Sequence, residues 1–190
     1  ADTDESAVER LALSFGANII ISGSGNRGML RKEATEDGIP TVTVELGKAH
    51  RFQIPLVEKA LAGVESVMNE YGILADGEVR WPGWFRVIES QTEKEWIRAD
   101  TGGLVDMKWG EYPFVYEGDV ICEISGHFDQ HVDEVCAPFT GLLVGVLENP
   151  VAAPGHPVCH LVRTDRSTRR EIEAEIRRGE LIGYEGRGDY

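Results

Sequence analysis

One stretch in the first quarter of the chain decides the fold that we expect: Gly38-Ile39-Pro40-Thr41-Val42-Thr43-Val44-Glu45-Leu46-Gly47-Lys48-Ala49. β-Branched residues fill positions 41–44, which is typical of a strand. The expected strand is buried and ends in the carboxylate of Glu45. Such a carboxylate lies where open α/β sheets place their ligand crevices, so Glu45 is a candidate general base. From position alone, the alternative is an ordinary surface Glu paired with Lys48 or Arg51.

The sequence around this stretch alternates between helical and strand patterns. We expect helices over residues 5–15, 29–36 and 55–71, where apolar residues recur at helical spacing or glycines mark the ends. Three consecutive isoleucines within residues 18–22 predict a short buried strand of the kind found in parallel sheets. Residues 1–73 are therefore expected to form an α/β unit with a mostly parallel sheet.

The character of the sequence changes at the linker 74–77. Short apolar runs separated by Gly, Pro and Asp fill residues 79–162, which predicts a small all-β domain. Residues 99–124 and 137–162 repeat the order strand, loop, Gly turn, strand, so two copies can close into a pseudo-twofold barrel. This arrangement resembles the biotinyl/lipoyl-like barrel. The hairpin 126–131 between the repeats has no Lys, so we do not expect a swinging-arm carrier.

A polar tail, residues 163–190, follows the β domain. Thr168 and Glu171 form a capping-box pattern, and Gly179 ends the helical spacing. We expect a solvated helix that lies on the body of the protein. A partner-binding tail is the less favoured alternative.

The composition limits the classes of partner. With 42% hydrophobic residues the chain can bury a core, and its net charge of −14 argues against binding nucleic acid or an anionic membrane by general electrostatics. Three cysteines without a CxxC spacing favour a soluble, cytoplasmic protein over a disulfide framework. The basic residues are 14 Arg and only 5 Lys. Acid excess with few lysines suggests a halophilic source, where salt screens self-repulsion; an ordinary acidic cytosolic protein is the alternative.

A glycine-rich loop is a second candidate site: Gly23-Ser24-Gly25-Asn26-Arg27-Gly28. It matches the G-x-G-x-x-G pattern of dinucleotide-binding proteins, follows an expected strand and precedes an expected helix. That helix is only about two turns long, and only one more helix follows before the all-β half. Nucleotide binding is therefore an alternative that the sequence disfavours.

Histidines and cysteines offer further candidates. Two pairs of histidines have a spacing of four residues: His127 with His131, and His156 with His160. The first pair lies in the hairpin between the repeats, and Pro157 separates the members of the second pair, so neither pair is expected to share one helix face. We therefore expect surface histidines and no metal site. Cys122 and Cys159 occupy equivalent repeat positions, which predicts small buried strand residues rather than a nucleophile.

The stretch Gly38–Ala49 resembles the late catalytic-domain signature of the succinylglutamate desuccinylase/aspartoacylase family, and the run from Glu45 to Ala49 is most similar to the desuccinylase branch. The resemblance implies a zinc-dependent deacylase related to zinc carboxypeptidases, which hydrolyses an N-acyl amino acid or a similar small amide. It places Glu45 at the family's catalytic Glu, which activates the zinc-bound water and passes its proton to the departing amine. Four basic residues are candidates for holding a substrate carboxylate: Arg27, Arg31, Lys48 and Arg51.

The sequence departs from that family in its zinc ligands. The family's His, Glu and second His all precede the catalytic Glu, whereas this chain has no His before His50 and only 44 residues before Glu45. The resemblance thus implies the C-terminal part of such an enzyme, with zinc held only in the intact parent and a missing N-terminal half or a homo-oligomer as partner. Taken alone, the chain should be inactive. The competing hypothesis is a non-enzymatic assembly or binding module.

Overall fold

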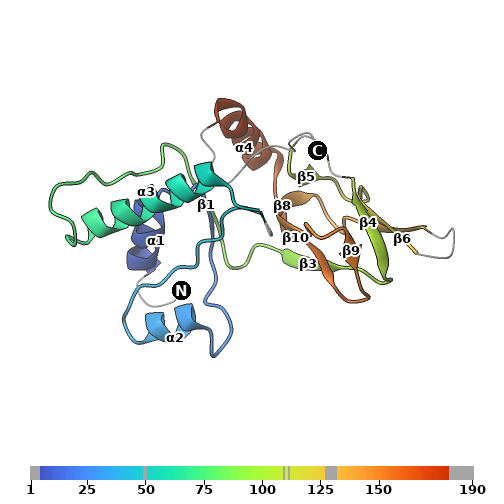
Figure 1. Cartoon of the computed structure of the whole chain (residues 1–190), viewed down its shortest axis with the longest axis horizontal. Helices are drawn as coiled ribbons and strands as arrows, with labels where there is room; N and C mark the ends of the chain where they lie inside the picture. The colour runs from blue at the N-terminus through green and yellow to red at the C-terminus, as the bar shows by residue number, and fades with distance from the viewer. Residues whose placement is uncertain (1–4, 49–50, 109, 111, 127–131, 180–190) are drawn as a thin grey trace. The chain divides into compact units, whose positions relative to one another are not determined.

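The computed structural model describes residues 5–48, 51–108, 110, 112–126 and 132–179. Within these residues the chain divides into two units, with the boundary between Gln91 and Thr92 (Figure 1). None of the described helices is both long and apolar enough to cross a membrane. The hairpin histidines His127 and His131, together with His50, lie outside the described residues.

The first unit contains three helices and one small sheet: α1 (Glu5–Ser14), β1 (Ile19–Ile21), α2 (Leu30–Glu36), α3 (Ile54–Glu70) and β2 (Arg86–Ile88). Helices α1 and α3 lie side by side in Figure 1. Gly63 of α3 allows this approach, because a Cβ there would lie 2.7 Å from the ring of Phe15. Pro55 occupies the first turn of α3, and Gly72 follows its end with φ of +69°, as the sequence predicts.

The expectation of a mostly parallel sheet is wrong. Strands β1 and β2 pair in parallel, with Ile20 opposite Val87, but every other strand pair in the described residues is antiparallel. The expected strand over residues 41–46 joins no sheet. A strand is stabilised by hydrogen bonds to a neighbouring strand, and the described residues place no strand beside this segment.

The boundary between the units falls later than the linker expected at residues 74–77. Residues 79–91 belong to the first unit because β2 pairs with β1 and the chain before it is tied to α3. The backbone N–H of Arg86 donates to the carbonyl of Asn18 at 2.7 Å, and that of Arg80 donates to Ser66 Oγ at 2.6 Å. The first unit therefore extends beyond residue 73, and the β domain begins near residue 92.

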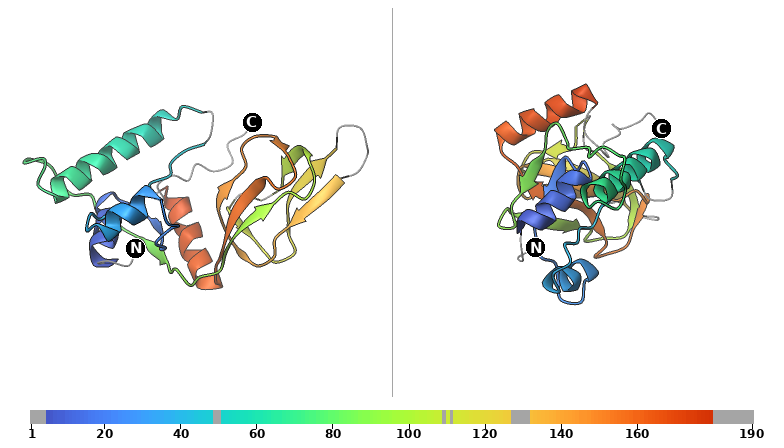
Figure 2. Two further views of the ribbon diagram at one scale, coloured as in Figure 1. Left: turned by 90° about the horizontal axis from the view of Figure 1, so that it is seen from below. Right: turned by 90° about the vertical axis from the view of Figure 1, so that its left-hand side faces the viewer.

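The second unit consists of two four-stranded antiparallel sheets and one helix. Its elements are β3 (Lys94–Arg98), β4 (Gly103–Met107), β5 (Phe114–Val115), β6 (Val120–Ser125), β7 (Val132–Cys136), β8 (Gly141–Val146), β9 (Val151–Ala152), β10 (Pro157–Arg163) and α4 (Arg166–Arg178). The strand orders are β3-β10-β8-β5 and β7-β6-β4-β9. The unit is the yellow-green to red part of the ribbon in Figure 2. Side chains from both sheets, including Ile121, Phe139 and Leu161, share one core. Two four-stranded sheets around a shared core make a sandwich, as in the biotinyl/lipoyl-like arrangement that the sequence resembles, and the strand pairs of the described residues do not show it closed into a barrel.

Hydrogen bonds confirm the internal repeat. The N–H of Gly118 donates to the carbonyl of Ala137 at 2.9 Å, and the N–H of Gly155 donates to that of Ala99 at 2.7 Å. Both glycines have a positive φ, +85° and +82°. The two sheets have the same arrangement. One contains β8 and β10 of the second repeat and ends with the short strand β5 of the first, whereas the other contains β4 and β6 of the first repeat and ends with the short strand β9 of the second. Each repeat therefore needs the other to complete its sheet.

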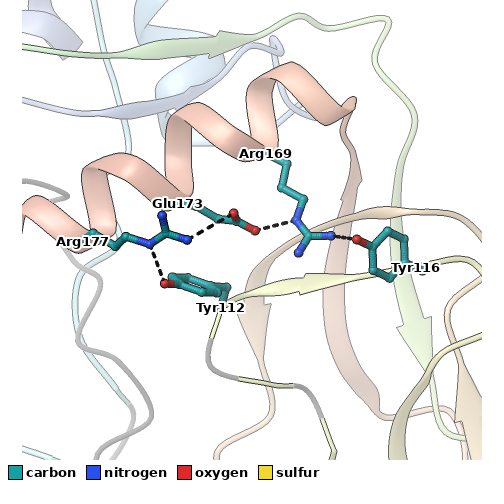
Figure 3. Close-up of polar contacts among 5 residues, drawn as sticks. All are labelled: Tyr112, Tyr116, Arg169, Glu173 and Arg177. Atoms are coloured by element: carbon teal, nitrogen blue, oxygen red, sulfur yellow. Dashed lines mark hydrogen bonds and ion pairs between the residues drawn. The ribbon is translucent and has the colours of Figure 1, made fainter.

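Helix α4 attaches to the second unit through Ile172 and a row of polar contacts. Arg169 Nε lies 2.6 Å from Glu173 Oε1, and its guanidinium also bonds the hydroxyl of Tyr116 (Figure 3). One turn further on, Arg177 Nε donates to the hydroxyl of Tyr112 at 3.0 Å. The helix begins after Asp165, whose carboxylate accepts from the N–H of Thr168 at 2.7 Å, so the N-cap precedes the expected capping box. Gly179 ends the helix as expected.

Cys122 and Cys159 lie in the core of the second unit, as their repeat positions predict. Both are almost fully buried, whereas Cys136 is exposed. Burial raises the pKa of Cys122 to about 11 and that of Cys159 to about 12. Both side chains therefore act as small apolar core residues and not as nucleophiles.

We expect Gly141→Ala to destabilise the second unit. A Cβ at Gly141 would collide with the backbone carbonyl oxygen of Val162, whereas at Gly145 on the same strand the nearest atom would be 3.8 Å away. The free energy of unfolding, measured by urea denaturation, should fall by about 2 kcal/mol in Gly141→Ala and by less than about 0.5 kcal/mol in Gly145→Ala. Equal stability of the two variants would show that β8 and β10 are not as close as described.

The raised thiol pKa values predict the pH dependence of both reactivity and stability. The folded state favours the neutral thiols, so their contribution to stability is complete below pH 9 and is lost as the pH rises toward 11 and 12. At pH 8 iodoacetamide should modify the exposed Cys136, whereas Cys122 should react at least about 100-fold more slowly than a thiol with the ordinary pKa of 9, because its thiolate fraction is lower by that factor. Mass spectrometry of tryptic peptides measures this. Rapid alkylation of all three cysteines in the native protein would contradict the assignment.

Candidate functional site

Glu45 lies on the connection that leads into α3. Gly47 turns this connection with φ of +84°, and a Cβ there would lie 3.1 Å from Gln53 Oε1. The N–H of Lys48 donates to the same oxygen at 2.7 Å. Gln53, the residue that precedes the first turn of α3, thus holds the segment just after Glu45 in place.

The surroundings of Glu45 differ from the expectation. Its side chain is exposed, and Val44 before it is 44% exposed, so Glu45 does not end a buried strand. The reason is the missing strand partner for residues 41–46, without which neither face of the segment is covered. The carboxylate of Glu45 is therefore open to solvent in the described structure.

The four basic candidates fall on two different segments. Lys48 and Arg51 lie on the same connection as Glu45, between it and the start of α3. Arg27 is exposed in the turn of the glycine-rich loop, and Arg31 lies on α2 with its guanidinium packed against Gly25. Proximity along the chain therefore favours Lys48 and Arg51 as companions of Glu45.

The first unit contains two hollows, both lined in part by α3. The first, of about 200 Å³, is lined by residues from the connection between α1 and β1, from α3 and from the chain before β2, among them Phe15, Lys59 and Trp84. The second, of about 220 Å³, lies next to it and shares Arg80 and Ala62. Glu45 lines neither hollow. Neither of these two hollows therefore forms a cleft around the carboxylate.

The glycine-rich loop is occupied by the protein's own side chains. The N–H of Gly28 donates to Glu33 Oε1 at 2.6 Å, and the N–H of Asn26 lies 3.4 Å from Met29 Sδ. A carboxylate at the position that a phosphate would take repels an anion. Helix α2, which follows, has only seven residues. This geometry argues against nucleotide binding at residues 23–28.

The described histidines are structural or exposed. The ring of His160 stacks on that of Trp96, with centroids 4.5 Å apart and planes at 9°. His156 is exposed in the turn before β10. Within the described part of the chain, no group of three or more His, Cys, Asp or Glu side chains is placed to hold a metal ion. The residues that the structure describes therefore do not fit a zinc ion by themselves.

Sequence reasoning missed a second apolar face on α3. The buried side of the helix contains Leu56, Gly63 and Ser66. A separate stripe remains uncovered, with the exposed fraction of its side chains between 38% and 60%: Ile54, Val57, Leu61 and Val64. The spacing of three and four residues is visible in the sequence, but the pattern merges with the buried side and reads as one wide face.

Comparison with known proteins shows which fold contains these elements. No family model and no curated protein matches this sequence. Solved structures do match. The ectoine utilization protein EutE (DoeB) from Ruegeria pomeroyi is 20% identical, with a TM-score of 0.72 over 86% of this chain and 52% of its own.

Two further structures match over a similar range. A succinylglutamate desuccinylase from Silicibacter sp. TM1040 is 18% identical, with a TM-score of 0.68 over 84% of this chain and 51% of its own. A succinylglutamate desuccinylase/aspartoacylase from Rhodobacter sphaeroides is 17% identical, with a TM-score of 0.70 over 87% of this chain and 52% of its own. The chain thus spans about half the length of the structures that it matches. At the level of the fold, the resemblance first seen at residues 38–49 is confirmed: this chain folds like one half of the succinylglutamate desuccinylase/aspartoacylase structures.

Proposed function

We propose that this chain belongs to the succinylglutamate desuccinylase/aspartoacylase family and forms part of a hydrolase that cleaves the amide bond of an N-acyl amino acid. The observation that carries the proposal is the match of 84–87% of this chain to three structures, two of which bear that family's name. The resemblance of residues 38–49 to the family's catalytic signature is a second, independent support.

The role of this chain in the reaction is proton transfer by Glu45. A carboxylate within hydrogen-bond reach of a water takes its proton as the water attacks the amide carbon. The same group then gives the proton to the departing amine, so that a carboxylate and an amine leave. The bond from Lys48 N–H to Gln53 fixes the backbone three residues after Glu45, which limits the positions that the carboxylate can take.

The zinc ion of the family does not belong to the residues described here. They contain no cluster of three or more suitable ligands, so the proposal places the zinc ligands outside the described residues. Lys48 and Arg51 are the proposed partners of a substrate carboxylate, because they share a segment with Glu45. Arg27 and Arg31 remain weaker candidates on the glycine-rich loop and α2.

A chimera tests the proposal. The part of Ruegeria pomeroyi EutE that this chain does not match is joined before Ala1, and amine release from N-acetyl-aspartate and N-succinyl-glutamate is measured with added Zn²⁺. We expect hydrolysis by the chimera and none by this chain alone. Glu45→Gln, which cannot accept the proton, should lower kcat/KM by about 10²–10⁴-fold with little change in KM.

Glu58→Gln provides the matched control, because it makes the same chemical change at an exposed position of α3. This variant should retain full activity. If Glu45→Gln is as active as Glu58→Gln, Glu45 is not the general base. If the folded chimera hydrolyses no acylated amino acid, the non-enzymatic module becomes the better interpretation.

The acidic surface supports the proposal that this protein works at high salt. On adjacent strands of one sheet, Asp106 faces Glu123, and Glu123 faces Glu134. Lys108 lies 2.5 Å from Asp106 and 3.0 Å from Glu123, and these hydrogen bonds raise the pKa of Lys108. In this row of three carboxylates, the ammonium group of Lys108 thus pairs with two, Asp106 and Glu123, in a chain of net charge −14.

Salt should therefore stabilise this protein. Raising KCl from about 0.01 M to about 1 M shortens the Debye length from about 30 Å to about 3 Å and screens the self-repulsion. We expect the urea midpoint of unfolding to rise over this range. In Glu134→Gln, which removes one of the opposed carboxylates, the rise should be smaller. A midpoint that stays constant or falls with KCl would contradict the proposal.

A further inference from the structure

The two hollows of the first unit are neighbours with opposite chemical character. The aromatic hollow, of about 200 Å³, is lined by Phe15, Lys59, Trp81 and Trp84, among others. The acidic hollow, of about 220 Å³, is lined by Glu65, Ser66, Asn69 and Glu78, among others. Arg80 and Ala62 line both hollows. A ligand that binds the guanidinium of Arg80 therefore lies at the border between an aromatic and an acidic environment.

Hydrogen bonds hold the walls of both hollows in place. One face of α3 supplies a wall of each, since four lining residues are spaced by three and four: Lys59, Ala62, Ser66 and Asn69. Opposite them runs the chain before β2. The N–H of Arg80 donates to Ser66 Oγ at 2.6 Å, and Asn69 Nδ2 donates to the carbonyl of Glu78 at 3.4 Å. A Cβ at Gly77 would lie 2.0 Å from Asn69 Nδ2, so glycine permits this close approach.

The aromatic hollow suits a ring that carries a carboxylate. Both of its charged lining residues, Lys59 and Arg80, are basic, although the chain has 33 acidic and only 19 basic residues. Its volume of about 200 Å³ exceeds the roughly 150 Å³ of an apolar cavity that holds benzene. Aromatic rings pack favourably against other rings, and a guanidinium binds a carboxylate through two parallel hydrogen bonds. The rings of Phe15, Trp81 and Trp84 thus favour an aromatic ligand, and the two cations favour an anionic one.

The acidic hollow suits a cationic hydrogen-bond donor. It is lined by the carboxylates of Glu65 and Glu78 and by the amide of Asn69. The Oδ1 atom of Asn69 is buried and has no hydrogen-bond partner among the residues that the structure describes. A buried acceptor without a donor is costly, and such groups in native proteins usually have a partner. An ammonium group, with its positive charge and three donors, matches this set of acceptors.

An α-amino acid is the small molecule that combines these requirements. Its carboxylate and its ammonium group are attached to one carbon atom, so they can lie on the two sides of Arg80. A plain carboxylate would use only the aromatic hollow, and a plain amine would use only the acidic one. With the carboxylate on Arg80, an aromatic side chain can enter the aromatic hollow while the ammonium group faces Glu65 and Glu78.

We propose that the aromatic and acidic hollows together form a binding site for a free α-amino acid with an aromatic side chain. Arg80 binds its carboxylate with help from Lys59, and the side chain packs against Trp81 and Trp84. The ammonium group binds in the acidic hollow. The site is distinct from the proposed reaction centre, because Glu45 lines neither hollow, and the proposal does not rest on the reaction.

Titration of the full chain with L-phenylalanine, followed by NMR, tests the proposal. The indole N–H signals of Trp81 and Trp84 should shift and saturate, with a Kd of about 0.1–1 mM for a ligand of about twelve heavy atoms. The signal of Trp96, on β3 of the second unit, should stay in place. Phenylpropionate lacks the ammonium group and phenethylamine lacks the carboxylate, so each should bind at least about fivefold more weakly than phenylalanine.

Three variants assign the contacts. Arg80→Gln should weaken phenylalanine binding by about tenfold or more, since it removes the carboxylate partner but keeps the backbone N–H that donates to Ser66. Arg170→Gln is the matched control, because it makes the same change at an exposed position of α4, and it should bind as the unchanged chain does. Glu78→Gln should lessen the preference for phenylalanine over phenylpropionate while binding of phenylpropionate changes little.

Several results would overturn the proposal. One is the absence of a saturable shift of Trp81 and Trp84 at phenylalanine concentrations up to about 10 mM. Another is phenylpropionate binding as tightly as phenylalanine, and a third is Arg80→Gln binding as tightly as Arg170→Gln. Both Arg80 and Glu78 are exposed, so circular dichroism should show that their variants fold, and the comparison of ligands needs no variant at all. Since no activity is measured, failure here is distinct from failure of Glu45 as a general base in the chimera.

Discussion

Coverage of apolar surface is the constraint on which the rest of this structure depends. A sheet or an amphipathic helix is stable when each apolar face packs against another layer. The second unit satisfies this condition alone, because its two sheets share one core and Ile172 of α4 is fully buried. The repeat makes this possible, since each sheet takes its last strand from the other repeat. The first unit does not satisfy the condition within the described residues.

The incomplete coverage of the first unit bears directly on Glu45. A general base acts in a site from which bulk water is excluded, and such a site needs walls on several sides. The described residues provide one of them: the connection after Glu45, held by the bond from Lys48 to Gln53. A crevice beside Glu45, as its proposed role requires, would need further walls that cover residues 41–46.

Local signals in the sequence predicted local structure well. The ends of α3 and α4 follow from Pro55, Gly72 and Gly179, and the repeat follows from Gly118 and Gly155, because these residues determine backbone geometry where they stand. Burial of Cys122 and Cys159 followed from the same repeat. All strands of the second unit lie within one continuous segment of the chain, so each strand finds its hydrogen-bonding partners inside that segment.

The failures concern features that depend on distant partners. Residues 41–46 have the composition of a strand, but composition does not supply the neighbour whose hydrogen bonds would make it one. The boundary at residue 91 depends on the pairing of β2 with β1 across more than sixty residues. Each strand has only three residues, and its sequence does not indicate which strand it pairs with. For α3, the period of the pattern located the apolar residues, but it did not divide them between a buried face and an open one.

Native-state hydrogen exchange of the isolated chain tests the central claim most directly, because it measures how firmly each unit holds itself together. The account predicts that backbone amides in β6, β8 and β10 exchange only on global unfolding of the second unit, while those of β1, β2 and α3 exchange through openings of much lower free energy. Equal protection of both units would show that the first unit is complete as it stands, and the need for a further polypeptide beside Glu45 would disappear.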